Sequence, residues 1–263
     1  MEVIDAHAHA FPDEIAPRAI SRIEGLAGVH SVLDGTASSL LRSMDAAGIE
    51  RSVVLSIATK PSQFDSILAW SRSVQNNRIL CLPSVHPADS KAAERIRIAA
   101  EEGFRGMKFH PYYQDFDLDD PMMDPLYASL EEHGMVCVSH TGFDHAFPFV
   151  RRADPPRILR VLARFPRLSF LATHLGAWKD WDLVARLLPG ARLWIDSAYS
   201  LEFLPPEEAR SLILSFPADR LLFGSDSPWA CQGKSLALVR SLALDPAREK
   251  ALLGENAKAL FRI

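Results

Sequence analysis

The chain has 263 residues, of which 48% are hydrophobic and 24% charged, with a formal net charge of −4. This length is typical of one (β/α)₈ barrel, and the composition is that of a globular domain with a large core. The negative charge, without any block of Lys and Arg, argues against nucleic acid as a partner. No stretch approaches the roughly 18 apolar residues of a membrane span, and no signal-peptide pattern opens the sequence.

The three cysteines are Cys81, Cys137 and Cys231, an odd number without CxxC spacing. Neither a disulfide framework nor a thiolate metal site is therefore expected. These features together predict a soluble, cytoplasmic protein that acts on a small molecule. They do not define the oligomeric state, so a homo-oligomer stays open.

Short apolar runs alternate with longer amphipathic stretches along nearly the whole chain. Eight strands are predicted at residues 3–7, 51–57, 79–85, 103–109, 135–140, 168–174, 193–198 and 221–226. Helices with a Ser, Asp or Pro start signal nearby are predicted at residues 62–76, 90–102, 124–132, 156–165, 178–188, 206–216 and 234–242. This alternation predicts an α/β fold, a single-domain (β/α)₈ TIM barrel over residues 1–263, although an open doubly wound sheet would share it.

The first crossover is unusually long, at about residues 10–50, and it contains a predicted helix near 38–47. Long loops of barrel enzymes commonly carry function, so this segment is a candidate lid or pocket wall. The tail from residue 246 to 263 is predicted to be helical and to pack across the bottom or the side of the barrel.

Six of the nine histidines lie at or just beyond the predicted C-terminal ends of strands, and they are His7, His9, His86, His110, His140 and His174. In this architecture those ends form one rim, where active sites are built. His7 and His9 stand two apart in an extended segment, so both imidazoles are expected on one face, as half of a zinc site. Asp5 shares their parity and is expected to accept a hydrogen bond from a ligand imidazole.

His140, His174 and Asp226 each end an apolar run. A carboxylate at such a position is costly to bury unless it is paired or bound to a metal, although Asp226 could instead cap the following helix. Three imidazoles and one carboxylate form a suitable zinc ligand set that leaves one position open.

These residues lie in motifs that resemble the amidohydrolase superfamily, in particular the amidohydrolase-2 branch that includes aminocarboxymuconate-semialdehyde decarboxylase. The motifs occur in the family's order at residues 5–9 (DAHAH), 106–111 (GMKFHP), 139–142 (SHTG), 173–176 (THLG), 224–229 (GSDSPW) and 254–257 (GENA). The resemblance implies that one divalent metal, often zinc, is bound by His7, His9, His140 and Asp226. It also implies that His174 contacts the substrate or moves protons.

Lys108 is open to two interpretations. Some members of the superfamily use a carbamylated lysine on the fourth strand to bridge two metals, but we favour a structural or substrate-orienting cation. Lys108 and His110 share strand parity, so both are expected to face inward. Nuclease relatives tend to carry a glutamate on this strand, and its absence argues against nuclease activity.

The sequence favours a hydrolase in which a metal activates water, Asp226 accepts and returns the proton, and His174 assists. The expected substrate is a small, cyclic or aromatic carboxylate bound by Lys108, His110, Tyr112 and Trp229. Further aromatic residues near the strand ends are candidates to line its pocket, and they are Tyr113, Phe143, Phe147, Trp178 and Tyr199. Further candidate anchors for the substrate carboxylate are Arg105, Arg151 and Arg152.

The main alternative is a lyase, a metal-dependent non-oxidative decarboxylase that uses the same residues on an unsaturated or aromatic acid. A non-catalytic metal-binding protein is disfavoured, because the ligand set and the proton-transfer candidate are both intact.

Overall fold

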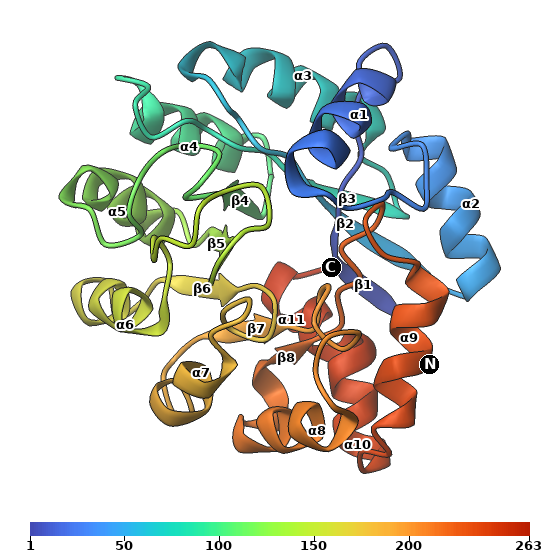
Figure 1. Ribbon diagram of the computed structural model, residues 1–263. Coiled ribbons are helices and arrows are strands. Elements are labelled where there is room, and N and C mark those ends of the chain that lie inside the picture. Colours follow the sequence, from blue (N-terminus) through green and yellow to red (C-terminus); the bar gives the residue numbers. More distant parts are fainter.

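In the computed structural model, which describes residues 1–263, eight parallel strands form the centre of the molecule and helices surround them (Figure 1). The strands are β1 Ile4–Ala8, β2 Arg51–Leu55, β3 Ile79–Leu82, β4 Gly106–Phe109, β5 Val136–Ser139, β6 Ser169–Ala172, β7 Trp194–Asp196 and β8 Leu221–Leu222. Within the runs β1 to β3 and β4 to β8, each strand pairs in parallel with the next.

Two further seams close the sheet into a barrel. The amide of Lys108 donates to the carbonyl of Pro83 at 2.9 Å, which joins β4 to the end of β3. The amide of Ala6 donates to Phe223 at 2.7 Å, and Ala8 bridges Ser227, which joins β1 to β8. The predicted barrel is therefore confirmed, and all eight predicted strands are present. Most of them end earlier than predicted, because the residues that follow leave the ladder and form the rim.

The helices are α1 Ala16–Ala27, α2 Ala37–Ala47, α3 Phe64–Val74, α4 Ala92–Glu101, α5 Asp124–Glu132, α6 Pro155–Arg164, α7 Trp181–Leu187, α8 Pro206–Ser215, α9 Gln232–Ser241, α10 Pro246–Lys250 and α11 Asn256–Phe261. The structure also contains three short 3₁₀ helices, η1 Pro61–Gln63, η2 Pro121–Met123 and η3 Ala218–Arg220. A π-helical turn, η4, spans Ala251–Glu255. None of the helices is long and apolar enough to cross a membrane.

Of the helices, α1 was not predicted. It has no side-chain N-cap, it contains Gly25, and it buries only Ala16 and Ile20. Its sequence nevertheless carries two helix signals, Pro17 in the first turn and Gly28 just past the last residue. The long first crossover is thus built from two helices, α1 and α2, rather than one.

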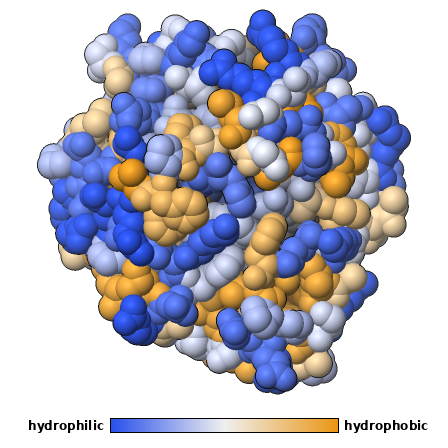
Figure 2. Space-filling view, viewed as in Figure 1, coloured by the Kyte–Doolittle hydropathy of each residue, from blue (hydrophilic) through white to orange (hydrophobic).

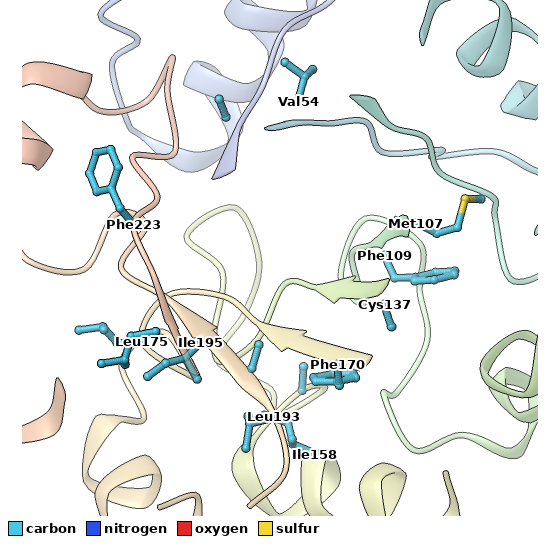
Figure 3. Close-up of a cluster of buried hydrophobic side chains, with 14 of the residues drawn as sticks. Val54, Met107, Phe109, Cys137, Ile158, Phe170, Leu175, Leu193, Ile195 and Phe223 are labelled. Carbon is cyan, nitrogen blue, oxygen red and sulfur yellow. The ribbon is translucent and has the colours of Figure 1, made fainter. Parts of the chain in front are cut away.

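Alternation along the strands separates two apolar layers. Residues such as Met107, Phe109 and Phe170 point outward into the layer beneath the helices (Figure 3). Residues of the opposite parity fill the barrel interior and pack against Leu260 and Phe261 of α11. The C-terminus lies near the middle of the view in Figure 1, so the tail closes one end of the barrel. The other end is left for the polar residues that follow the strands.

Candidate metal centre

An irregularity in β1 directs His7 and His9 into the rim. Three steps along β1, from Asp5 to Ala8, match only two steps along β2, so the alternation of faces changes within the strand. The Nε2 atoms of His7 and His9 lie 3.3 Å apart, which confirms that the two imidazoles share a face.

Asp5 does not share that face, and the expectation that it orients a ligand imidazole was wrong. Its carboxylate accepts hydrogen bonds from the amide of Ser225 at 2.9 Å, from Gln232 Nε2 at 2.7 Å and from the amide of His7 at 3.1 Å. Because these donors belong to β1, the segment after β8 and α9, Asp5 ties the seam of the barrel together.

Asp196, at the end of β7, takes the role expected of Asp5. Its Oδ2 lies 2.9 Å from His7 Nδ1, and its Oδ1 accepts from the amides of His174 at 2.9 Å and Ala198 at 3.1 Å. The side chain is fully buried, and burial raises the pKa of Asp196 to about 6. Sequence reasoning missed this residue, although Asp196 ends an apolar run in the same way as Asp226.

Asp226 faces the two imidazoles of β1. Its Oδ1 lies 3.2 Å from His7 Nε2 and 3.1 Å from His9 Nε2. Burial raises the pKa of Asp226, whereas His7 and His9 lower it when their rings are protonated; the net direction is downward, so the group is ionised. It does not cap α9, which has Cys231 at its N-cap and no side-chain cap. The metal-facing position expected for Asp226 therefore fits the structure better than the capping alternative.

His140 and His174 complete the cluster from β5 and β6. His140 Nδ1 and His174 Nε2 lie 3.1 Å apart. His174, His7 and Asp226 each offer a ligand atom within 4.8 Å of the others. His174 adopts a positive φ of 59°, a strained conformation for a residue with a side chain.

Each of the four imidazoles has one nitrogen engaged outside the cluster. His9 Nδ1 lies 2.7 Å from the carbonyl of Leu55, His140 Nε2 2.9 Å from that of Phe143, and His174 Nδ1 2.9 Å from that of Ala198, while His7 Nδ1 faces Asp196. A carbonyl accepts only from an N–H, so these contacts leave the inward nitrogens unprotonated.

Burial favours the neutral imidazoles further. It lowers the pKa of His7 and His140 well below the usual value, and it also lowers the pKa of His174. Neutral imidazoles with free inward nitrogens, together with an ionised carboxylate, are the donors that a divalent metal requires. The residues present therefore fit such an ion.

Lys108 and His110 both face the cavity beside this cluster, as their parity predicted. Lys108 is only 1% exposed, has no ion-pair or hydrogen-bond partner among its neighbours, and has its pKa lowered to about 8 by burial. His110 stacks on His140 with ring centroids 4.2 Å apart, and its Nε2 lies 3.4 Å from Asp144 Oδ2. Asp144 lies in a loop without a strand-end signal and was not predicted.

A cavity of about 890 Å³ opens above the cluster. It is lined by the predicted metal-site and substrate residues and by all seven predicted aromatic residues, including Tyr112 and Trp229. Figure 2 shows hydrophobic residues near the middle of the face seen in Figure 1.

Four residues singled out from the sequence do not reach the cavity. Arg151 pairs with Asp180 and Arg152 with Asp115, each at 2.8 Å, and Arg105 is not among the lining residues. The three arginines are therefore not carboxylate anchors at this site. His86 also stays outside, and its Nδ1 instead accepts from the amide of Ala88 at 3.1 Å.

At the rim of the closed barrel, His7, His174 and Asp226 form one group of potential metal ligands, and His110, His140 and Asp144 form a second group beside it. Such a rim is typical of metal-dependent (β/α)₈ enzymes. The chain belongs to the amidohydrolase family, whose Amidohydro_2 model matches residues 4–263. A search of curated proteins found no match.

Solved structures share the fold over the whole chain. An uncharacterized TIM-barrel protein from Bordetella bronchiseptica is 21% identical with a TM-score of 0.80, covering 100% of this chain and 99% of that one. The 2,6-dihydroxybenzoate decarboxylase from Rhizobium is 16% identical with a TM-score of 0.71 and the same coverage. A 5-carboxyvanillate decarboxylase from Novosphingobium aromaticivorans, complexed with manganese and 4-hydroxy-3-methoxy-5-nitrobenzoic acid, is 16% identical with a TM-score of 0.74, covering 100% and 96%.

Proposed function

We propose that the protein is a metal-dependent, non-oxidative decarboxylase of an aromatic carboxylic acid. The observation that carries the proposal is the set of inward-facing imidazole nitrogens, each freed by an outward hydrogen bond, around the ionised Asp226. Several solved structures with this fold are decarboxylases of hydroxylated benzoic acids, which supports a lyase over the hydrolase favoured by the sequence.

In this proposal His7, His9, His140 and Asp226 hold the metal, and His174 faces the substrate. Imidazole and carboxylate donors suit both zinc and manganese, and manganese is present in one of the similar structures. A bound divalent metal would act as a Lewis acid on the oxygen atoms of the substrate. His174 lies as close to His7 and Asp226 as a ligand would, so its role needs a test separate from that of His140.

The chain's own residues supply the remaining needs of the reaction. The Lys108 ammonium, buried without a partner, orients the carboxylate that leaves. The reaction adds a proton to the ring carbon, breaks its bond to the carboxylate and releases carbon dioxide. The proton comes from solvent: Asp226 and His174, which are both unprotonated on their inward sides, take it up and deliver it to the ring carbon. The aromatic wall that includes Trp178 and Tyr199 limits the access of further water.

The test combines metal analysis with a substrate screen. Protein purified without chelator is expected to contain about one equivalent of tightly bound metal, and the manganese- or zinc-loaded protein is expected to release carbon dioxide from 2-hydroxybenzoates. The screen also includes esters, lactones and amides. Turnover of those compounds without turnover of any acid would replace the lyase by a hydrolase. Less than half an equivalent of metal would count against the centre itself.

Three variants separate the roles of the histidines. His140→Ala is expected to lose metal and turnover together. His174→Gln is expected to keep the metal and lose turnover, whereas loss of metal would make His174 a ligand. His86→Ala is the matched control, because His86 also follows a barrel strand but stays outside the cavity, and it should retain both properties.

A further inference from the structure

The cavity is larger than the proposed reaction requires. Its volume of about 890 Å³ is near the upper end of the roughly 300–1,000 Å³ found for pockets that hold drug-sized ligands. A single-ring acid with its carboxylate at the metal centre would leave most of this space unfilled. The lining residues beyond the histidine cluster include a set from α1 and a set from the segment that runs from residue 57 into α3.

One wall of this extension, here called the α1–α3 groove, is an apolar stripe along α1. Residues at helical spacing, Ile15, Ala19, Ile23 and Leu26, line the cavity. None of them is buried, whereas Ile20, on a neighbouring face of the same helix, is buried close to Phe11 and Gly35. The protein therefore covers the stripe only in part, although α1 buries apolar side chains elsewhere.

The facing wall is also apolar. Ile67 and Trp70 lie one turn apart on α3 and are half-buried, and Ile57 joins them from the end of the β2 segment. Among the cavity-lining residues of α1 and of the segment from residue 57 to the end of η1, the only charged ones are Arg22 and Lys60, which are both cationic. No carboxylate lines this part of the cavity. The α1–α3 groove therefore suits a neutral apolar group, and it would not repel such a group if that group also carried a negative charge.

We propose that the substrate carries an extended apolar arm, such as an alkyl chain, that occupies the α1–α3 groove while its carboxylate is held at the histidine cluster. The cavity is continuous between these two parts, because one cavity is lined by His7 and Lys108 at one end and by Leu26 and Trp70 at the other. This inference rests on the proposed function for the position of the carboxylate, but the groove itself does not depend on which reaction takes place.

The test uses two series of probes, the 4-alkyl and the 5-alkyl 2-hydroxybenzoates with chains of zero to six carbons. Binding to the manganese-loaded protein is measured by calorimetry. Each methylene that enters the groove is expected to tighten the dissociation constant about fourfold, from about 0.8 kcal/mol per buried methylene. Affinity that stays flat or falls with chain length in both series would overturn the proposal.

Variants of α1 locate the chain. Ala19→Trp places a large side chain in the α1–α3 groove and is expected to remove the chain-length gain while leaving the affinity for unsubstituted 2-hydroxybenzoate unchanged. Ser21→Trp is the matched control, because Ser21 lies on the exposed side of α1 outside the cavity, and it should retain the gain. Ile23→Gln is a smaller change that serves as a second variant in case Ala19→Trp does not fold. It is expected to reduce the gain in affinity per methylene. A gain unaffected by both groove variants would contradict the location proposed.

Carbon dioxide release from the same compounds separates the two proposals. A chain-length gain in binding without release of carbon dioxide would overturn the decarboxylase and keep the groove. Release that is fastest with the unsubstituted acid, together with no gain in binding, would keep the decarboxylase and overturn the groove.

Discussion

Replacing Lys108 by Met should stabilise the protein. Lys108 is buried without a partner, and burial lowers its pKa from the ordinary value of 10.5 to about 8. At 1.36 kcal/mol per pKa unit, the charged side chain destabilises the folded state by about 3 kcal/mol at pH 7. Met keeps the length and the apolar stem but has no charge to desolvate. We therefore expect the free energy of unfolding of Lys108→Met to exceed that of the wild type by an amount of this order.

The gain should depend on pH in a defined direction. Below about pH 8 the lysine is protonated in both the folded and the unfolded chain, so the full cost is present. Between about pH 8 and 10.5 the folded chain holds the neutral amine while the unfolded chain stays charged, so the cost declines. The advantage of Lys108→Met should therefore be largest at pH 7 and should shrink toward pH 10.5. Urea unfolding of the metal-free proteins at pH 7, 8.5 and 10 measures it.

Lys60→Met is the matched control, since Lys60 lines the same cavity but is exposed, and its stability should change by less than about 0.5 kcal/mol. A folded Lys108→Met protein that is no more stable than the wild type at pH 7 would refute the reasoning, as would a gain that does not vary with pH. If Lys108 orients the substrate, the stabilised variant should also bind 2-hydroxybenzoate more weakly, because stability and function oppose each other at this position.

Two further predictions concern the frame of the site. Asp196→Asn presents an amide N–H to His7 Nδ1, which favours the tautomer with a proton on the inward nitrogen, so metal affinity measured by competition with a chelator should fall about 10- to 100-fold. Asp180→Asn, which breaks only the pair with Arg151, is the control, and equal affinities would contradict the role of Asp196. Gly142→Ala, with a φ of 86° and its added Cβ 2.0 Å from the Trp178 amide, should lower the unfolding free energy by more than about 3 kcal/mol. Gly28→Ala, with positive φ but open space, should cost only about 1 kcal/mol, and similar losses in both would exclude the clash.

The barrel could be predicted because its strands are buried on both faces and therefore read as apolar runs. Its rim followed from the same pattern, since His140, His174 and Asp226 end such runs and parallel strands in a barrel end on one side. His140 and His174 lie 3.1 Å apart at this rim, and His174 lies close to His7 and Asp226. That His7, His9, His140 and Asp226 share one metal stays a prediction. Sequence position was informative here because a residue at the C-terminal end of a strand lies at a known end of the barrel, close to the rim.

The supporting contacts could not be predicted, because they depend on register and on distant residues. The irregularity of β1 moved Asp5 away from the imidazoles, and no pattern in its sequence marks where the alternation changes. Asp196 reaches His7 across 189 positions of the chain, and which strand end meets which ring depends on how the barrel closes. Asp144 lies in a loop whose conformation is set by tertiary contacts. Periodicity identifies faces of elements, but it does not identify partners.

Backbone conformation at the rim explains how the ligands are held in place. Five of the eight non-glycine residues with positive φ follow β6, β7 or β8, and they are His174, Leu175, Lys179, Tyr199 and Asp226. Such conformations cost roughly 1–2 kcal/mol each and persist only where other contacts enforce them. The contacts are present, because the amide of His174 donates to Asp196 and the amide of Asp226 donates to the carbonyl of His7 at 2.8 Å.

These bonds belong to the closed barrel and to Asp196. The two strand ends that deliver His174 and Asp226 are thus held in uncommon backbone conformations by the protein itself. The ring nitrogens they face are oriented in the same way, by carbonyls and a carboxylate outside the cluster. The affinity for a metal is therefore expected to depend on the outward contacts as much as on the ligands. Asp196 contacts no metal in the proposal, but it fixes the orientation and the tautomer of the ligand His7. Its replacement should therefore weaken metal binding.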